Sequence, residues 1–282
     1  MQQAATRCVC CGDADSIPHL RVLHRCNKCG HVWADMSLTD EQVSQLYAEG
    51  YFTGEEYLDY SREAPALERN FKNRTAELLR LHPEGGRLFE IGAAYGYFQR
   101  IARQHFVTSG CDVSAHAVEF ACRENGANVR TANYLTMPPP DQPDDIICMW
   151  DTIEHLNEPD RFIRKAFAEL RPGGTLALST GDIGSLNARI QGAKWRLIHP
   201  PTHLHYFTVH SMTTLLTNAG FREVRISHPV FWRSADASAH HLLANPPDSR
   251  TAWLYSLLRR SGLTGFSFPL NLFDLMTVFG TK

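Results

Sequence analysis

The chain has 282 residues, enough for one sizeable core with an accessory module, and its 43% hydrophobic and 21% charged residues fit a soluble globular protein. A net charge of −2 argues against a nucleic acid partner, and no apolar run reaches membrane-spanning length. Residues 1–7 lack the apolar core of a secretion signal, so we expect a cytoplasmic protein.

The amino-terminal residues contain two Cys-x-x-Cys pairs separated by 14 residues: Cys8 with Cys11, and Cys26 with Cys29. Four thiolates are the ligand set of a structural zinc ion, and they leave no open position for catalysis. Disulfides are disfavoured without a secretion signal, and Cys10 falls outside the ligand spacing. The pattern predicts a zinc ribbon over residues 1–37 that holds one structural zinc ion.

The next segment, residues 38–84, is helical in pattern. Leu67, Phe71 and Leu78 keep helix spacing, and Pro83 stops the run. Residues 47–60 are rich in tyrosine and phenylalanine, which is consistent with a packed pair of aromatic helices.

A strand, a glycine turn and a helix follow. Leu88, Phe89 and Ile91 form a short apolar run typical of a buried strand, and Gly92 and Gly96 come directly after it. Glycine lets the backbone approach a ligand closely, and the start of the helix offers free N–H groups. The spacing does not match the dinucleotide-binding Gly-x-Gly-x-x-Gly motif.

Further strand and helix pairs continue to the carboxyl terminus. A strand over 106–113 brings Asp112 to a position 20 residues after Gly92, where an acid can accept hydrogen bonds from ribose hydroxyls. Further strands are expected at 146–150, 175–179 and 224–226, and an antiparallel strand at 273–279. Helices are expected at 115–124, 162–170, 212–219 and 253–258.

Four motifs then reveal a specific resemblance: Glu90–Gly96, Gly110–Ser114, Asp145–Leu156 and Leu170–Gly174. Their order and spacing resemble those of the Rossmann-like, S-adenosylmethionine-dependent methyltransferases, over about residues 66–228. The resemblance implies an α/β fold in which residues 85–282 form a seven-stranded, doubly wound sheet. It also implies a set of cofactor-binding residues: Glu90, Gly92, Ala94, Gly96, Tyr97, Asp112, Val113, Asn133, Tyr134, Trp150 and Asp151. Ala94 stands where the family has its middle glycine.

The same resemblance gives the helical segment a second interpretation. In methyltransferases of this type, an amino-terminal helical segment with a Tyr-Phe stretch closes over the cofactor. Residues 38–84 would then form a lid or linker segment.

Asp151, Glu154 and His155 follow the strand that ends near Trp150, where the methyl group is expected to point. Related quinone O-methyltransferases carry a Glu-x-x-Glu-His run at this place. The three side chains could orient a substrate hydroxyl, act as bases, or hold a divalent ion together. The alternative is structural, because Asp151 and Glu154 also have the spacing of a helix capping box.

A histidine-rich insert, residues 185–207, separates the strand at 175–179 from the next helix. Loops at the carboxyl ends of parallel strands carry substrate sites in such sheets. His203 to Phe207 resembles a signature of sugar C-methyltransferases and small-molecule O-methyltransferases that share the zinc-ribbon start. We predict His203 or His205 as general base, with His155 and Glu154 as further catalytic candidates.

The expected function is methyl transfer to a small molecule, which would be a hydroxylated metabolite, a sugar or a glycan precursor, on oxygen or carbon. One rival is an RNA methyltransferase that recognises RNA through the ribbon, although the ribbon's charges nearly balance. The other rival is a non-catalytic protein that binds the cofactor. The sequence leaves the oligomeric state open.

Overall fold

The computed structural model describes residues 7–20, 22–47, 63–244 and 250–282. Its centre is a seven-stranded sheet with the strand order β10-β13-β8-β7-β4-β5-β6. Five neighbouring strands are parallel, and β13 is antiparallel to both of its neighbours, as predicted. The strands are β4 (Arg87–Ile91), β5 (Val107–Asp112), β6 (Val129–Thr131), β7 (Asp144–Trp150), β8 (Leu170–Gly181), β10 (Arg222–Ser227) and β13 (Leu275–Thr281). This is the predicted Rossmann-like fold.

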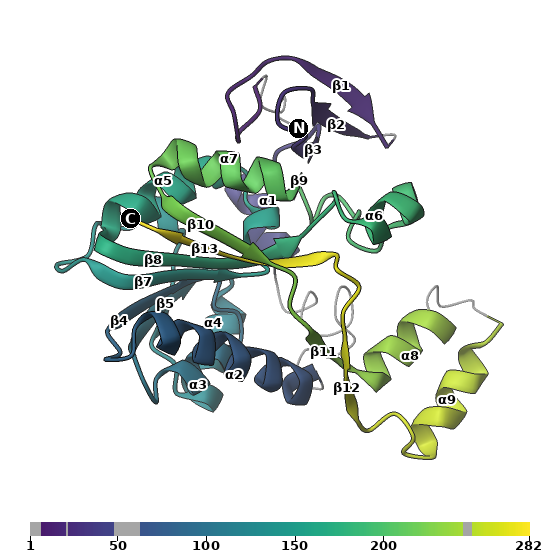
Figure 1. Ribbon diagram of the computed structural model, residues 1–282. Coiled ribbons are helices and arrows are strands. Elements are labelled where there is room, and N and C mark those ends of the chain that lie inside the picture. Colours follow the sequence, from purple (N-terminus) through teal and green to yellow (C-terminus); the bar gives the residue numbers. More distant parts are fainter. Residues whose placement is uncertain (1–6, 21, 48–62, 245–249) are drawn as a thin grey trace.

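Helices cover both faces of the sheet (Figure 1). One layer contains α2 (Ala64–Leu81), α3 (Tyr97–Ala102) and α4 (Ala115–Asn125). The opposite layer contains α5 (Pro159–Glu169) and α7 (Val209–Ala219). No helix of the described residues is long and apolar enough to cross a bilayer.

Strand β7 shows why the sheet needs two helical layers. Its residues Ile146, Cys148 and Trp150 belong to the core cluster under α2 and α3, whereas Ile147 and Met149 belong to the cluster under α5 and α7. Successive side chains of a strand point to opposite faces. A continuous apolar run is therefore buried on both sides, and this fixes β7 in the middle of the sheet.

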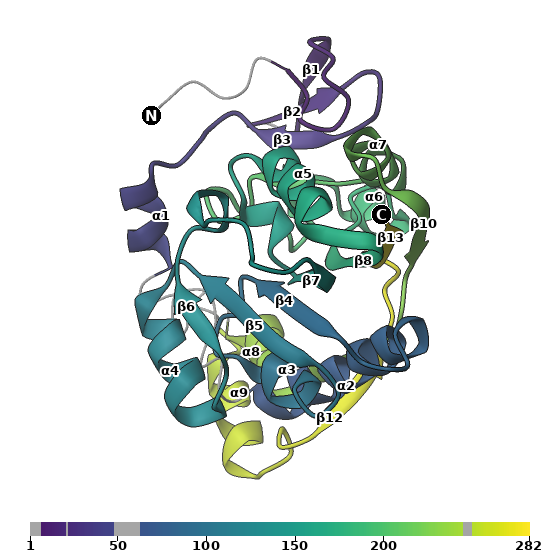
Figure 2. The same cartoon turned by 90° about the vertical axis from the view of Figure 1, so that its left-hand side faces the viewer.

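The amino-terminal ribbon forms a second, smaller sheet of β1 (Ser16–His19), β2 (Leu23–Cys26), β3 (Val32–Ala34) and β9 (His205–Tyr206). Strand β9 belongs to the histidine-rich insert and pairs antiparallel with β3. The ribbon packs over α5 and α7 in both views (Figure 2). The side-chain amide of Asn218 on α7 donates to the carbonyl of Cys10 at 2.9 Å. The insert is thus partly a strand that joins the ribbon to the larger domain.

The segment predicted as a lid is described only in part. Helix α1 (Asp40–Leu46) begins with a capping box in which Thr39 and Gln42 exchange hydrogen bonds. The aromatic stretch from 48 onward lies outside the described residues, which resume at 63, just before α2. Tyr47 is the part of that stretch that can be placed.

A helical hairpin between β10 and β13 extends beyond the prediction of one short helix. It contains β11 (Phe231–Ser234), α8 (Ala235–Leu243), α9 (Ala252–Arg260) and β12 (Ser267–Leu270). Strands β11 and β12 pair with each other, and the two helices stand clear of the sheet (Figure 1). We call the described residues of this region, 231–244 and 250–270, the helical hairpin. Among the described residues, the other elements are α6 (Leu186–Gln191) and the 3-10 turns η3 (Tyr134–Thr136), η4 (Ile153–His155) and η5 (Gly192–Lys194).

Candidate functional site

A cavity of about 480 Å³ lies at the carboxyl ends of β4, β5, β6 and β7. We call it the edge pocket. Helices α1 and α2 close another side of it with Val43, Tyr47, Leu67 and Phe71. Nine of the eleven predicted cofactor-binding residues line it: Glu90, Gly92, Ala94, Asp112, Val113, Asn133, Tyr134, Trp150 and Asp151.

The glycine turn after β4 forms the floor of the edge pocket. Gly92 has a φ of 75°, and a Cβ atom there would lie 2.6 Å from the side chain of Thr152. Ala94 has a φ of 46°, in the left-handed region that favours glycine. Asp112 fixes this turn, because its carboxylate accepts hydrogen bonds from the backbone N–H groups of Ala94 at 2.8 Å and Ser114 at 2.9 Å.

Gly96 and Tyr97 do not line the edge pocket. Gly96 precedes α3 with a φ of 73°, and a Cβ atom there would lie 2.8 Å from Cβ of Ala127. Its role in the structure is close packing of α3 against the region after α4. Tyr97 is the first residue of α3, and its side chain is buried in the core with its ring near Tyr95.

Acidic side chains give the edge pocket its electrostatic character. Glu90 is 2% exposed, and burial raises the pKa of its carboxyl well above the usual value. Burial also raises the pKa of Asp112. Glu90 Oε2 and the indole N–H of Trp150 are buried with no hydrogen-bond partner among the described residues. Asp151 and the half-exposed Glu158 also line the edge pocket, so four acidic residues line it in total. The described lining contains no lysine or arginine.

Asn133 and Tyr134 have different roles at the end of β6. The Asn133 side chain accepts from the backbone N–H of Leu135 at 3.0 Å and so caps the turn η3. The Tyr134 hydroxyl donates to Glu169 at 2.6 Å, and its ring packs between Phe89 and Phe162. Tyr134 is therefore mainly a core residue that forms one wall of the edge pocket.

Asp151 is held by a buried arginine that the sequence analysis did not identify. Arg74 on α2 donates to Asp151 Oδ2 at 3.1 Å and to the hydroxyl of Ser179 at 2.9 Å. Ser179 in turn donates to Asp151 Oδ1 at 2.8 Å. Although burial opposes the charge, Arg74 and Ser179 hold the pKa of the Asp151 carboxyl below its usual value. Asp151 forms no helix cap; Thr152 occupies that position before η4 and makes no side-chain cap bond.

Glu154, His155 and His203 form a compact cluster in which one ligand atom of each lies within 4.8 Å of the others. Glu154 is 5% exposed, and its Oε2 has no hydrogen-bond partner among the described residues. Burial, and then the charge of Asp151, raises the pKa of Glu154 to about 8. Glu154 is therefore protonated near neutral pH in the metal-free protein.

Both histidines of this cluster are oriented by backbone carbonyls. Nδ1 of His155 lies 2.9 Å from the carbonyl of Thr202, and Nδ1 of His203 lies 2.9 Å from the carbonyl of Leu197. A carbonyl can only accept, so in the neutral rings Nδ1 carries the proton and Nε2 is the unprotonated nitrogen. Burial lowers the pKa of His155 to about 4 and that of His203 well below its usual value. His155 lines the edge pocket, and His203 packs behind it with the ring centroids 4.6 Å apart.

His205 lies elsewhere, between the ribbon and the larger domain. Its Nδ1 is 3.0 Å from Nε2 of the buried His31, and its ring stacks on His31 and Phe207. It does not line the edge pocket among the described residues. The structure thus separates His205 from the other three catalytic candidates.

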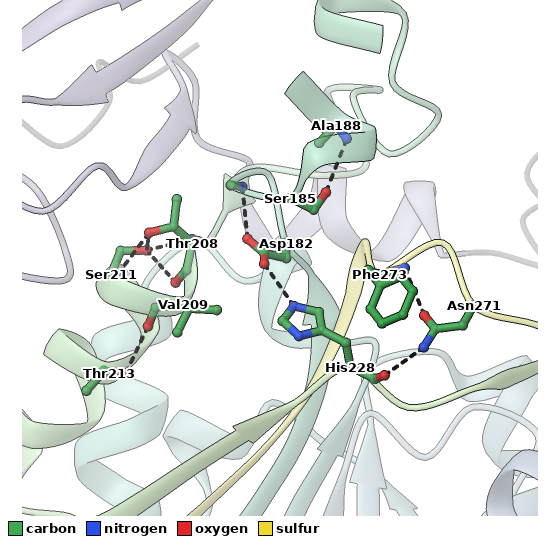
Figure 3. Close-up of polar contacts among 11 residues, drawn as sticks. Asp182, Ser185, Ala188, Thr208, Val209, Ser211, Thr213, His228, Asn271 and Phe273 are labelled. Carbon is green, nitrogen blue, oxygen red and sulfur yellow. Dashed lines mark hydrogen bonds and ion pairs between the residues drawn. The ribbon is translucent and has the colours of Figure 1, made fainter. Parts of the chain in front are cut away.

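Asp182, at the end of β8, anchors the start of the histidine-rich insert (Figure 3). Its Oδ1 accepts from the backbone N–H of Gly184 at 2.8 Å, and its Oδ2 pairs with His228 at 2.9 Å. Ser185 then caps α6 by accepting from the N–H of Ala188. These contacts fix the insert relative to β10 and need no functional explanation.

The four predicted zinc ligands converge. Their sulfur atoms lie within 4.8 Å of one another, with Cys8 3.5 Å from Cys29 and Cys11 3.5 Å from Cys26. Cys10 is buried beside them but is not part of this set. Four convergent thiols suit the ligand chemistry of a tetrahedral zinc ion.

Sequence reasoning missed the lining residues that come from distant helices. Leu67 and Phe71 had been assigned only to a helix face, and Val43 gave no signal at all. Arg74 could have been noticed as a charged residue on the apolar side of α2, three residues after Phe71. A buried arginine requires an acidic partner, which points to the carboxyl edge of the sheet.

A family model for a methyltransferase domain matches residues 60–226. A malonyl-[acyl-carrier protein] O-methyltransferase of Methylococcus capsulatus is 28% identical over 170 residues, which are 57% of this chain and 61% of the relative. The match thus spans about three fifths of that relative's length. A probable S-adenosylmethionine-dependent methyltransferase of Mycolicibacterium smegmatis is 31% identical over 193 residues, which are 64% of this chain and 71% of the relative.

Solved structures agree on the fold. A methyltransferase from Thermotoga maritima superposes with a TM-score of 0.53 at 20% identity, covering 79% of this chain and 94% of its own. One from Archaeoglobus fulgidus also gives 0.53, at 17% identity, covering 79% and 99%. Both are described as S-adenosylmethionine-dependent.

Proposed function

Because the chain belongs to the S-adenosylmethionine-dependent methyltransferases, we propose that it methylates an oxygen or a carbon atom of a small molecule. The acceptor class is a hydroxylated metabolite, a sugar or a glycan precursor. The similarity to a relative that is an O-methyltransferase supports oxygen as the first acceptor to test.

The observation that carries this proposal is the acidic lining of the edge pocket. Glu90, Asp112 and Asp151 come from the ends of three adjacent strands, and the described lining includes no lysine or arginine. Such a pocket suits a ligand with cationic groups, as the sulfonium and ammonium of S-adenosylmethionine are. Glu90 Oε2 and the indole N–H of Trp150 are buried and have no hydrogen-bond partner among the described residues. Polar groups of a bound ligand could form hydrogen bonds with both. When bound there, the cofactor supplies an already activated methyl group.

His155 is our candidate for the general base. It lines the edge pocket, and the unprotonated Nε2 of its neutral ring is the nitrogen that would accept the proton of an acceptor hydroxyl. His203 supports it from behind, as a positioning residue. Asp151 also lines the edge pocket, and its ion pair with Arg74 favours its ionised form.

The same cluster is a candidate site for a divalent ion. Our sequence analysis grouped Asp151 with Glu154 and His155, but the compact set consists of Glu154, His155 and His203. Two imidazoles oriented by carbonyls and one carboxylate are a common ligand set for a transition metal. Zinc in the ribbon is a separate proposal, with a structural role.

The test measures the production of S-adenosylhomocysteine by the wild type and by two variants. Each protein is assayed with a panel of hydroxylated small molecules and with transfer RNA. We expect turnover with a small molecule, which falls roughly a hundredfold or more in His155→Ala, the usual contribution of a general base. His205→Ala is the matched control, since it alters a buried histidine outside the edge pocket. Turnover with RNA alone would refute the proposed substrate class. Unchanged turnover in His155→Ala would refute the role of His155.

The ion is tested separately. If the cluster binds an essential metal, a chelator abolishes turnover and Mn²⁺ restores it in the wild type. In His203→Ala the same addition should restore little. Full turnover in the presence of chelator would refute the ion and leave His155 as base.

A further inference from the structure

The helical hairpin exposes an unusual number of large apolar side chains. Those on α8, α9 and the turn after α9 are 57–77% exposed: Leu242, Trp253, Leu257, Leu263 and Phe266. Single exposed apolar residues are normal on proteins, but five within one short hairpin are not. Helices α8 and α9 stand clear of the sheet (Figure 1). None of the five residues lines the edge pocket.

Helix α9 is oriented by the one large side chain it buries. Tyr255 is 7% exposed, packs edge-on against His240 of α8 and directs its hydroxyl to Asp236 at 3.3 Å. Trp253 and Leu257 lie two residues to either side of Tyr255, about 200° away around the helix. They are four residues apart and so lie on one face, which is turned away from α8.

Four of the five charged side chains in the described part of the hairpin are arginines, and the fifth is Asp236. Arg250, Arg259 and Arg260 lie at the two ends of α9 and form no ion pair with any described residue. The acid of the described hairpin, Asp236, is directed inward, where it accepts hydrogen bonds from Tyr255 and from Thr264 at 3.0 Å. The exposed surface therefore combines tryptophan, leucine and phenylalanine with arginine.

We propose that the helical hairpin docks on the surface of an anionic lipid bilayer. Tryptophan, leucine and phenylalanine enter the boundary between headgroups and acyl chains, while arginines contact lipid phosphates. A second copy of the chain is a poorer fit, because it would bring three arginines that have no ion-pair partner among the described residues against three identical ones. The inference depends on the hairpin alone and stands independently of the acceptor that is methylated.

Vesicle flotation of the full chain tests it. Vesicles of phosphatidylcholine with phosphatidylglycerol should carry the protein upward, vesicles of phosphatidylcholine alone much less, and binding should weaken in high salt. The double variant Trp253→Ser/Leu257→Ser should lose at least tenfold in partitioning, because two apolar side chains no longer enter the bilayer.

A matched control exists on α6, where Leu186 and Ile190 are also four residues apart and are 74% and 76% exposed. Leu186→Ser/Ile190→Ser should float like the wild type, and both double variants should keep their affinity for S-adenosylmethionine, which verifies the fold. Equal flotation of the two double variants, or no flotation of the wild type, would overturn the proposal. So would a dimer in solution that Trp253→Ser/Leu257→Ser abolishes, since the surface would then bind a second copy.

Discussion

The guanidinium of Arg74 lies 3.1 Å from the carboxylate of Asp151, and this contact ties α2 to the end of β7 at the rim of the edge pocket. Arg74 is buried and its guanidinium also lies over the ring of Trp150, 4.6 Å from the centroid. Asp151 has a φ of 51°, a conformation that few non-glycine residues adopt. Arg74 thus stabilises the ionised form of Asp151 and helps to keep its backbone in this conformation.

Replacing this arginine should destabilise the fold in a pH-dependent way. We expect Arg74→Met to lower the free energy of unfolding by about 2 kcal/mol at pH 7, as for hydrogen bonds to a charged group. The pKa of Asp151 is lowered in the fold, so this stability is present above the unfolded pKa of about 4 and is lost as pH falls through the folded pKa.

Urea unfolding at pH 7 and pH 3 measures both effects. Arg80→Met is the control, because Arg80 lies exposed on the same helix. A difference between wild type and Arg74→Met that stays equal at the two pH values would show that Arg74 stabilises by packing alone.

Glu154 should have the opposite dependence on pH. Its pKa is raised to about 8 by burial, so the fold prefers its neutral form. The wild type should therefore lose stability between pH 5 and pH 8, by on the order of 4 kcal/mol for this group, since each pKa unit corresponds to about 1.4 kcal/mol. Glu154→Gln removes the titration and should become progressively more stable than the wild type over that range.

The measurement is the free energy of unfolding of both proteins at several pH values, with chelator present so that no ion occupies the cluster. A constant difference between pH 5 and pH 8 would mean that Glu154 ionises normally. The pH slope decides the outcome, because any change in hydrogen bonding by the glutamine amide is independent of pH.

Zinc removal should affect more than the ribbon. Cys26→Ser should lose the metal, because three thiolates hold zinc less well than four, whereas Cys10→Ser should keep it. Strand β3 pairs with β9, and His31 contacts His205, so we expect loss of zinc to loosen the insert that carries His203.

Metal analysis and amide hydrogen exchange measure the two consequences. Cys10→Ser serves as the control for changing a buried thiol. If Cys26→Ser lacks zinc but β9 keeps its protection, the insert is held by the larger domain alone, and the ribbon is only an appendage.

Some of this architecture was accessible from sequence because the signals are local. The apolar run of β7 by itself indicates a buried strand. The glycines after β4 by themselves indicate a turn with an unusual backbone conformation. The partners of these residues could not be found in this way. Nothing near His205 predicts that it pairs with the ribbon, and nothing near Asp151 predicts Arg74, because both contacts join segments far apart in the chain.

The side-chain environments were equally inaccessible. Glu154 and Asp151 are three residues apart and chemically alike, yet the fold raises the pKa of one and lowers that of the other. The difference depends on which acid meets the guanidinium and which is buried without a countercharge. The spacing of the two acids in the sequence reveals neither the partner of Asp151 nor the burial of Glu154.

The glycine turn offers the sharpest pair of substitutions, because Gly92 and Ala94 both have left-handed φ values of 75° and 46°. In Gly92→Ala the new Cβ would lie 2.6 Å from the side chain of Thr152, and the left-handed backbone adds about 1–2 kcal/mol. We therefore expect Gly92→Ala to lose most of its S-adenosylmethionine affinity and to unfold more easily.

Ala94→Gly should behave differently. It relieves the strain of a left-handed alanine, but glycine gives the unfolded chain more freedom, which costs roughly 0.5–1 kcal/mol. The two effects nearly cancel, so stability should change by less than about 1 kcal/mol. The N–H of residue 94 still reaches Asp112, and the affinity measured by calorimetry should be kept. A large loss of affinity in Ala94→Gly would mean that the alanine methyl group itself contacts the cofactor.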